Sequence, residues 1–246
     1  MADRGMVEQK ARAMEVPRIV VYGASGHALA IGLHVRHRLL ARPLCEVVAY
    51  IDDFRGEQGL TLDDIPIISF DRWRREFVNY GCFIAVGDPR ARRRLAQRVS
   101  SHSGFFATLY QHSDVAIPHV SIGVGSIVAA TSDVGPQSSL GDHVIVMPMS
   151  WIAHDVTIGN YVSIGASCSI SGHVVIEDEV FVGAGVTVVN GRAGKPLKIG
   201  AGANIAAGAV VTKSIPAKAS VAGNPARPLR EIVLARRERG HAWPHA

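Results

Sequence analysis

The sequence predicts two kinds of structure in one chain, a small α/β domain followed by a parallel β-helix. Aliphatic residues recur at every sixth position through the C-terminal half, a period that fits neither an α-helix nor a simple strand. Short fixed repeats indicate a stack of like units, and hexapeptide repeats indicate a parallel β-helix. The N-terminal part instead alternates short apolar runs with helical segments, which favours a small parallel sheet covered by helices.

The hexads predict the interior of the coil. They begin near Val115, slip at residues 190–198, resume at Ile199 and end near Ile215. Small residues favour the fourth position after the aliphatic one; Cys168 is at such a position, so we expect it to pack inside rather than act as a nucleophile. The aliphatic residues that keep one phase are Ile122, Val128, Val134, Leu140, Val146, Ile152, Ile158, Ile164, Ile170, Ile176, Val182 and Val188.

The N-terminal part contains four apolar runs that read as strands, with a helical segment after the first one that continues to about Leu40. We expect Met1 to Val16 to be a polar, poorly ordered leader. The predicted strands are Arg18–Tyr22, Glu46–Ile51, Ile65–Ile68 and Cys82–Val86. The predicted domains are a small parallel α/β domain at 17–110, the β-helix at 111–225 and a C-terminal helix with its tail at 226–246.

Composition narrows the class of protein. No apolar stretch among the 246 residues approaches the ~20 needed to cross a bilayer, and we see no signal peptide. Three scattered cysteines without CxxC spacing (Cys45, Cys82 and Cys168) indicate reduced thiols in a cytoplasmic protein and argue against a zinc site. The net charge of +5 is mild.

Basic residues gather in two segments that we expect to form helices with solvated faces. No aromatic residues are interleaved with them, which argues against a nucleic-acid site. Small molecules that carry phosphate make better use of this charge. The clusters are Arg90, Arg92, Arg93, Arg94 and Arg98, and Arg227, Arg230, Arg236, Arg237 and Arg239.

A glycine loop follows the first strand and precedes a helix. Backbone N–H groups in such a loop can face an anion, assisted by the helix dipole. Asp52 and Asp53 end the next strand, where a carboxylate can accept hydrogen bonds from a ribose or a base. The alternative is a tight turn with a capping aspartate and no ligand. Four short strands form a mononucleotide-sized unit, so we expect a nucleotide or nucleotide sugar.

His154 and Asp155 share one corner of the predicted coil. Three hexads make one turn, so Gly172, which follows His154 by three hexads, should lie beside it about 4.8 Å along the coil. A carboxylate can orient an imidazole that takes a proton, and an uncommitted glycine N–H could stabilise an oxyanion. A solvated corner histidine is the alternative.

Three further histidines also lie near corners. Zinc held by several histidines has to be weighed in such coils, but we expect no pair of histidines to face each other on adjacent turns. We therefore predict no metal. These histidines are His119, His143 and His173.

Several motifs together resemble the bacterial hexapeptide-repeat sugar acyltransferases, which join a small Rossmann-like domain to a left-handed β-helix. One branch N-acetylates nucleotide-linked 4-amino sugars, and a sibling branch O-acetylates sialic acid. The markers are Tyr22-Gly-Ala-Ser-Gly-His27, Ile51-Asp-Asp53, Ala153-His-Asp155, Ile170-Ser-Gly-His173, Ala206-Ala-Gly-Ala-Val-Val-Thr-Lys213 and Val221-Ala-Gly-Asn-Pro-Ala226.

The resemblance implies a left-handed coil, a homotrimer with active sites in the grooves between coils, and acetyl-CoA as donor. It implies that His154 is the general base, assisted by Asp155, and that the Gly172 N–H meets the thioester oxygen. The residues implied to bind the sugar nucleotide are Gly23, Ser25, Gly26, His27, Asp52, Asp53, Gly87 and Asp88. Besides Gly172, Ala184 is expected to contact acetyl-CoA, and we expect its 3′-phosphate to meet Arg192, Lys195 and Lys198 in the insertion.

The chain departs from the family pattern at three places. Ala28 replaces an expected glycine, the insertion at 190–198 interrupts the coil, and Tyr161 and Ser163 stand where some relatives carry a second histidine.

The expected function is acetyl-CoA-dependent N-acetylation of a nucleotide-linked amino sugar, with a 4-amino-4,6-dideoxy sugar favoured, in cell-surface polysaccharide biosynthesis. Transfer would be direct, with a histidine general base. O-acetylation of a sugar hydroxyl is the alternative enzyme. A non-catalytic sugar-nucleotide sensor that uses the coil only to trimerise is the alternative from another class.

Overall fold

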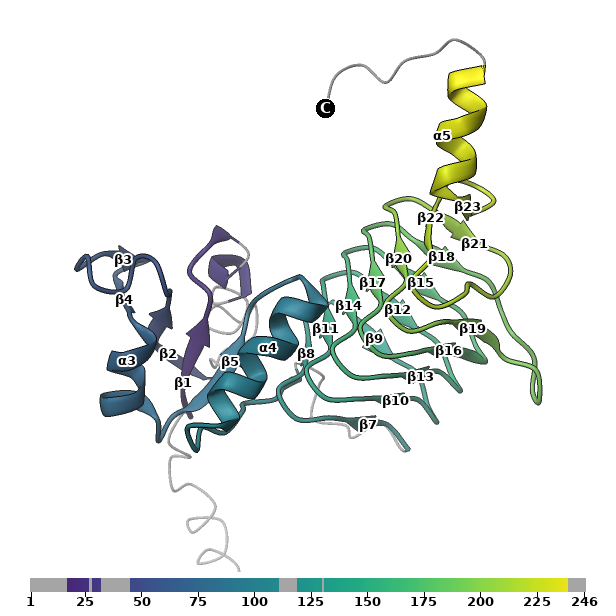
Figure 1. The fold of residues 1–246 in the computed structure, drawn as a ribbon. Helices are drawn as coiled ribbons and strands as arrows, with labels where there is room; N and C mark the ends of the chain where they lie inside the picture. The colour runs from purple at the N-terminus through teal and green to yellow at the C-terminus, as the bar shows by residue number, and fades with distance from the viewer. Residues whose placement is uncertain (1–16, 27, 32–44, 111–118, 130, 239–246) are drawn as a thin grey trace, which may run out of the picture.

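The structure is a computed structural model that describes residues 17–26, 28–31, 45–110, 119–129 and 131–238 (Figure 1). The predicted leader, His27 and the expected continuation of the first helix to Leu40 lie outside these described residues. The two predicted parts are visible as a small sheet domain and a long stack of short strands.

The N-terminal domain is a five-stranded sheet of order β3-β4-β2-β1-β5. Neighbouring strands are parallel except for β3 and β4, which form an antiparallel pair that the sequence did not predict. The strands are β1 (Arg18–Tyr22), β2 (Glu46–Ile51), β3 (Thr61–Leu62), β4 (Ile65–Ile68) and β5 (Gly81–Ile84). The helical elements are a turn at residue 26 and residues 28–31, α3 (Phe70–Arg72), a π-helical turn (Trp73–Phe77) and α4 (Pro89–Ser100).

The C-terminal domain is a three-sided, left-handed parallel β-helix, as predicted. Face 1 contains β7 (Ser121–Ile122), β10 (Ser139–Leu140), β13 (Thr157–Ile158), β16 (Val174–Ile176) and β19 (Leu197–Ile199). Face 2 contains β6 (Leu109–Tyr110), β8 (Ile127–Val128), β11 (Ile145–Val146), β14 (Ser163–Ile164), β17 (Phe181–Val182), β20 (Asn204–Ile205), β22 (Ser220–Ala222) and β23 (Arg227–Pro228). Face 3 contains β9 (Asp133–Val134), β12 (Trp151–Ile152), β15 (Ser169–Ile170), β18 (Thr187–Val188) and β21 (Val210–Val211).

Strand pairing confirms the predicted repeat. Ile152 pairs with Ile170, three hexads further along the chain, in the parallel register between β12 and β15. Across the insertion the spacing between partners is longer, and Ile176 pairs with Ile199. The aliphatic column is buried, with Ile152 and Ile170 both at 0% exposure, and Cys168 packs inside, where its thiol donates to the Gly183 carbonyl. Burial of these side chains is the main force that holds the turns together.

Two of the three edges of the coil contain a histidine that is compared below, and we name each edge after its histidine. The His154 edge joins face 3 to face 1 and comprises residues 135–138, 153–156, 171–173 and 189–196. The His143 edge joins face 1 to face 2 and comprises residues 123–126, 141–144, 159–162, 177–180 and 200–203.

The N-terminal domain packs on face 2 and the His143 edge. Ala24, Ala28 and Ile31 share one buried cluster with Ile127 and Ile145 of face 2. Helix α4 lies against the His143 edge, where Arg93 pairs with Glu179. Because the His154 edge joins the other two faces, it is the edge of the prism that lies opposite face 2.

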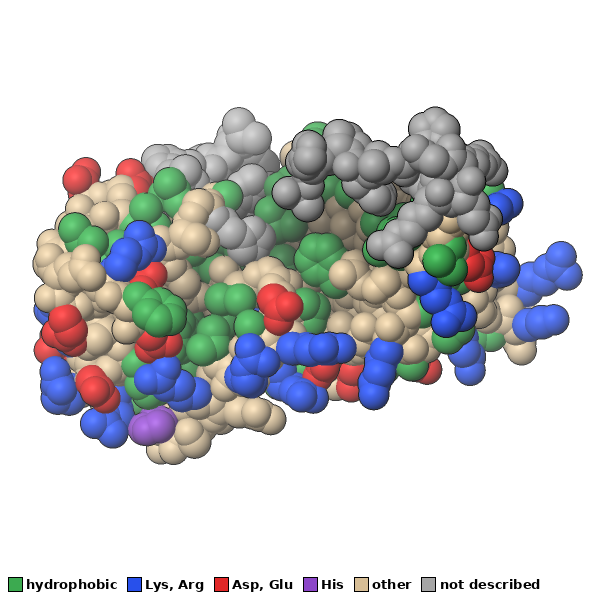
Figure 2. Space-filling model, turned by 45° about the horizontal axis from the view of Figure 1, so that its top comes forward, with side chains coloured by type: hydrophobic (Ala, Val, Ile, Leu, Met, Phe, Trp, Pro, Cys, Tyr) green, Lys and Arg blue, Asp and Glu red, His purple; other side chains and the backbone are tan. Residues whose placement is uncertain are grey.

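Helix α5 (Leu229–Glu238) is the last described element and follows the final strands of face 2. Among the described residues, no helix combines the length and the apolar character needed to span a bilayer. On the side drawn in Figure 2, Lys and Arg side chains line one border of the molecule with acidic side chains among them. Cys45, Cys82 and Cys168 are all buried free thiols.

Candidate active site on the His154 edge

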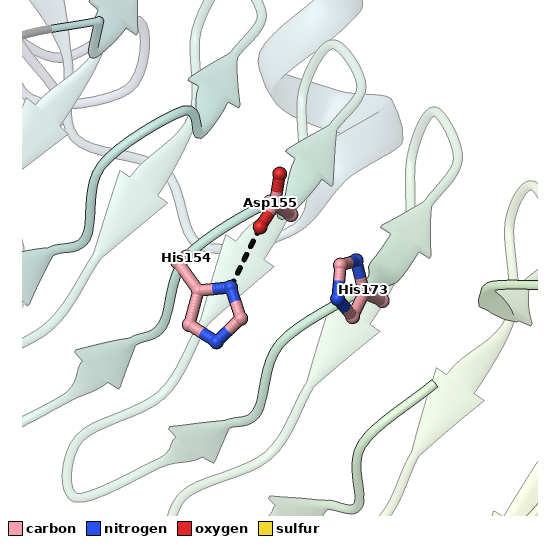
Figure 3. A group of neighbouring side chains, drawn as sticks. All are labelled: His154, Asp155 and His173. Atoms are coloured by element: carbon pink, nitrogen blue, oxygen red, sulfur yellow. Dashed lines mark hydrogen bonds and ion pairs between the residues drawn. The ribbon is translucent and has the colours of Figure 1, made fainter. Parts of the chain in front are cut away.

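His154 and Asp155 follow β12 and form a hydrogen-bonded pair at the corner of the coil. His154 Nδ1 lies 2.7 Å from Asp155 Oδ2 (Figure 3). Asp155 has a φ of 57°, a left-handed conformation that aspartate tolerates better than most residues. With the carboxylate accepting from Nδ1–H, Nε2 is the nitrogen left to take a proton. The His154 side chain is 55% exposed, so a substrate can reach it.

Gly172 lies beside His154 on the next turn, as the repeat spacing predicted. A Cβ atom added at Gly172 would lie only 2.8 Å from Cε1 and 3.0 Å from Nε2 of His154. A larger residue would therefore push the imidazole out of place. The absence of a side chain leaves the room in which a reacting group could approach both residues.

The expectation that the Gly172 N–H is uncommitted was wrong. This N–H donates to Asn190 Oδ1 at 2.8 Å. Asn190 begins the insertion, one further step of three hexads along the same edge. The repeat spacing could have revealed it, because residues 154, 172 and 190 are in one column of the coil.

The sequence reasoning that no two histidines would face each other on adjacent turns was also wrong. His173 lies against His154, with ring centroids 5.3 Å apart and planes at 86°. The ligand atoms of His154, Asp155 and His173 lie within 4.8 Å of one another (Figure 3). His173 directly follows Gly172, so a step of one full turn plus one residue brings the two histidines together. This geometry removes one premise of the prediction that there is no metal.

The glycine loop lies at the edge of the sheet where β1 ends. Gly23 has a φ of 118°, and a Cβ there would lie 3.2 Å from the Ala85 carbonyl oxygen after β5, so this position favours glycine. Ser25 and Gly26 are exposed where the helical turn begins. The loop therefore has the glycine backbone and the exposure that the predicted anion-binding loop requires.

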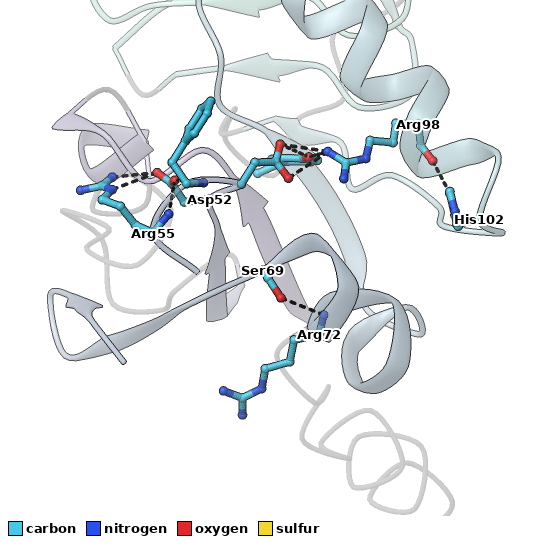
Figure 4. Close-up of polar contacts among 9 residues, drawn as sticks. Asp52, Arg55, Ser69, Arg72, Arg98 and His102 are labelled. Carbon is cyan, nitrogen blue, oxygen red and sulfur yellow. Dashed lines mark hydrogen bonds and ion pairs between the residues drawn. The ribbon is translucent and has the colours of Figure 1, made fainter. Parts of the chain in front are cut away.

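Asp52 and Asp53 are both held by arginines, and Figure 4 shows Asp52 beside Arg55. Asp52 accepts from the backbone N–H of Phe54 at 2.9 Å and pairs with Arg55 at 2.9 Å. Burial acts to raise the pKa of Asp52, but these hydrogen bonds outweigh it and hold the pKa below its usual value. Asp53 accepts from the Tyr22 hydroxyl and from Arg98, each at 2.8 Å. Both carboxylates therefore order the loop after β2. The alternative interpretation, a tight turn with a capping aspartate, expected this of one of them.

Sequence reasoning missed Phe54, which directly follows this pair. Its side chain is 92% exposed at the carboxyl end of β2, beside the predicted nucleotide-binding loop. An aromatic ring here could stack on a base.

Gly87 and Asp88, which were predicted to bind the sugar nucleotide, both make contacts within the protein. Asp88 caps helix α4 by accepting from the Ala91 N–H at 2.6 Å, and the Gly87 carbonyl accepts from the Ser163 hydroxyl at 2.6 Å. The side chain of Asp88 is thus engaged in capping, which a strand followed by Asp-Pro could have indicated.

Arg92 is the most buried charged residue in the described chain, at 0% exposure, so the expectation of a solvated face was wrong for it. Its guanidinium donates to carbonyl oxygens of both domains, at 2.6 Å to Val86, 2.9 Å to His143 and 2.7 Å to Tyr161. Burial lowers the pKa of Arg92 to about 10, which still leaves it charged at neutral pH. It fixes the N-terminal domain on the His143 edge.

The residues predicted to bind acetyl-CoA divide between two edges. Arg192 and Lys195 face each other across a small hairpin in the insertion, on the His154 edge, and Lys198 follows on face 1. Ala184 instead lies between face 2 and face 3, so a single chain does not bring it together with His154.

Each of the two domains matches a known protein family model. Residues 18–99 match the PglD N-terminal domain model, and residues 155–190 match the bacterial transferase hexapeptide (six repeats) model. The chain is 35% identical over 147 residues to GDP-perosamine N-acetyltransferase of Escherichia coli O157:H7, an alignment that covers 60% of this chain and 66% of that protein.

Two solved structures are similar over nearly their whole length. WeeI from Acinetobacter baumannii AYE is 31% identical with a TM-score of 0.70, and the match covers 86% of this chain and 99% of that one. The acetyltransferase domain of PglB from Neisseria gonorrhoeae FA1090, in complex with acetyl coenzyme A, is 28% identical with a TM-score of 0.70, covering 86% and 98%. The chain therefore belongs to the bacterial hexapeptide-repeat sugar acetyltransferases with an N-terminal Rossmann-like domain, the family that its motifs predicted.

Proposed function

We propose that this protein transfers an acetyl group from acetyl-CoA to the amine of a nucleotide-linked amino sugar. The observation that carries the proposal is the His154–Asp155 pair with Gly172 beside it on one edge of the coil. The N-acetyltransferase among the relatives and the acetyl-CoA complex of the PglB domain support the reaction and the donor. A GDP-linked 4-amino-4,6-dideoxy sugar is the first candidate for the acceptor, because that relative is named for a GDP-linked sugar.

The chemistry is direct acyl transfer. The sugar amine attacks the thioester carbonyl, a C–N bond forms, and His154 Nε2 takes the proton that the nitrogen loses. Asp155 stabilises the resulting imidazolium through Nδ1–H. The Gly172 N–H stabilises the oxyanion of the tetrahedral intermediate. When the C–S bond breaks, the proton on His154 passes to the leaving thiolate and the free thiol of CoA departs.

The sugar nucleotide binds at the N-terminal domain. Gly23, Ser25 and Gly26 receive the diphosphate at the start of the helical turn. His27, which lies outside the described residues, keeps the diphosphate-binding role that the resemblance implied. Phe54 stacks on the base, beside the loop that Asp52 and Asp53 order. We expect Phe54→Ala to raise the KM for the nucleotide sugar roughly 5- to 150-fold, because stacking of one base on an aromatic side chain contributes about 1–3 kcal/mol. The KM for acetyl-CoA should stay unchanged, and Leu60→Ala, at another exposed apolar residue of the domain, is the control.

The complete site needs a second copy of the chain. Within one protomer the glycine loop is followed by a helical turn that packs on face 2, whereas His154 lies on the opposite edge. Exposed apolar side chains on the coil, Trp151 at 51% and Met149 at 64%, support association of coils. We therefore infer a homotrimer in which the nucleotide loop of one protomer faces the His154 edge of its neighbour.

The donor lies along the His154 edge. Arg192 and Lys195 project from the same edge as His154, toward the C-terminal end of the coil, and Lys198 is exposed beside them. This basic group suits the 3′-phosphate of coenzyme A. The three buried free thiols are consistent with action in the cytoplasm, which we retain as the expected compartment.

A thiol-release screen tests the function. Wild-type protein is incubated with acetyl-CoA and GDP-, UDP- or dTDP-linked 4-amino sugars, with His154→Ala as the control. Release that depends on one nucleotide sugar and on His154 is the expected result. Release with sialic acid and no nucleotide requirement would instead identify an O-acetyltransferase. Nucleotide-sugar binding without thiol release from any acceptor would identify a sensor.

A further inference from the structure

Side chains of the coil cap backbone N–H groups of the preceding turn. On the His143 edge, Asp142 Oδ1 accepts from the Val124 N–H at 2.8 Å, Asn160 Oδ1 from the Asp142 N–H at 2.9 Å, and Asp178 Oδ1 from the Asn160 N–H at 2.7 Å. Each acceptor lies 18 residues after its donor. This ladder satisfies corner N–H groups that the strands leave without a partner.

Asn190 makes the same contact on the His154 edge. Its Oδ1 accepts the Gly172 N–H at 2.8 Å, and the Gly191 N–H donates to the Gly172 carbonyl at 3.0 Å. Both backbone polar groups of Gly172 are therefore held by the start of the insertion. The contact differs from the ladder in its surroundings, because the acceptor lies where the reacting carbonyl is proposed to bind.

The exposure of the two partners makes this contact exchangeable. Gly172 is buried, whereas Asn190 is exposed to solvent. A group that reaches the Gly172 N–H from outside must therefore take the position of the Asn190 amide oxygen. The thioester oxygen is also a carbonyl acceptor, so its arrival would replace one acceptor with another and leave the buried N–H satisfied.

We propose that Asn190 is a positioning residue whose amide oxygen holds the place of the thioester oxygen on the Gly172 N–H until acetyl-CoA displaces it. This inference rests on the proposed function. The tethered amide competes with the acetyl group alone and not with the rest of coenzyme A, because free CoA has no carbonyl at its thiol end. Asn190 therefore lowers the preference of the enzyme for acetyl-CoA over CoA.

Calorimetric titration of the full-length protein with acetyl-CoA and with CoA tests this role. We expect Asn190→Ala to raise the ratio of acetyl-CoA affinity to CoA affinity by roughly 3- to 10-fold, the range of one exchanged neutral hydrogen bond. Affinity for CoA should not change. Asn190→Asp should lower the ratio, because a carboxylate holds the N–H more strongly than an amide does.

Asn160→Ala is the matched control, since Asn160 makes the same ladder contact on the other edge. Its ratio should equal that of wild type. A ratio in Asn190→Ala that is unchanged, or lower than wild type, would overturn the proposal while leaving the function intact. Wild-type protein that binds neither acetyl-CoA nor CoA would instead refute the proposed function itself.

Discussion

The His143 edge and the His154 edge are built from the same hexapeptide frame, yet they place their histidines in opposite environments. His143 is 5% exposed, stacks on Tyr161 at 5.1 Å and meets Phe106 edge-on at 4.4 Å. Burial lowers its pKa to about 4. His154 is mostly exposed and bonded to a carboxylate. The first imidazole is a neutral packing element at physiological pH, and the second is available for proton transfer.

What differs between the two edges is what covers them. Helix α4 and the segment around Phe106 cover the His143 edge, and Arg92 fixes that contact by bonding to carbonyl groups of both domains. Nothing in the described chain comparably covers His154. The hexapeptide repeat thus builds equivalent corners, and the packing of the N-terminal domain determines which histidine is buried.

Removal of the proposed base should give the largest effect. His154→Ala should lower kcat by about 10²–10⁴, because general-base assistance is lost. The side chain is exposed, so the thermal midpoint should change little. Steady-state thiol release measures kcat. A fall of less than about threefold would show that His154 is a solvated corner residue and that the two edges do not differ in function.

Removal of the buried guanidinium tests the covered edge. Arg92→Met should lower the free energy of unfolding by about 2–4 kcal/mol, because several buried carbonyl groups lose their donor. This corresponds to a fall of roughly 5–15 °C in thermal midpoint. Arg94→Met, at an exposed position of the same helix, is the control and should leave the midpoint unchanged. Equal thermal midpoints for the two variants would contradict the claim that Arg92 fixes the N-terminal domain on the His143 edge.

The pH dependence of stability should report on His143. Its pKa is about 4 in the folded protein and 6.5 as an ordinary value, so the unfolded chain binds the proton more readily. The contribution of neutral His143 is present above pH 6.5 and is lost as pH falls toward 4. His143→Phe should remove about 1–2 kcal/mol of the loss in stability between pH 7 and pH 5. Denaturant unfolding at pH 7 and at pH 5 measures the free energy of unfolding of both proteins. If His143→Phe lost as much stability between the two pH values as wild type does, the histidine would titrate normally.

The smallest effect is expected at the donor end of the His154 edge. Replacing Arg192, Lys195 and Lys198 together by glutamine should raise the KM for acetyl-CoA roughly 5- to 20-fold with little change in kcat, because a charge-assisted phosphate contact is lost. Lys213 and Lys218, replaced together, are the control pair. An unchanged KM would place the 3′-phosphate elsewhere.

Several features of the site were predictable because the repeat converts sequence spacing into distance. A step of three hexads placed Gly172 beside His154, and the motifs predicted the family and the fold class. The same rule, applied once more, would have found Asn190. His173 was missed because only the direct step of three hexads was considered, although the residue after it is also in reach of His154.

The remaining errors concern residues whose environment depends on contacts distant in sequence. Arg92 reads as one member of an exposed basic cluster, but its partners include carbonyl groups of His143 and Tyr161 in the other domain. Asp53 reads as a ligand-binding carboxylate, but Arg98 reaches it across the sheet domain. Composition and local pattern contain no information about such partners.

The sequence by itself determined the coil, its register and the neighbours within each column, because a six-residue period permits only one way to bury the aliphatic side chains. Tertiary structure alone decided which edge the N-terminal domain covers, and hence which histidine stays open to solvent. The physical reason is that repeats specify local packing identically at every corner, whereas desolvation of a particular imidazole depends on a domain that docks from elsewhere in the chain.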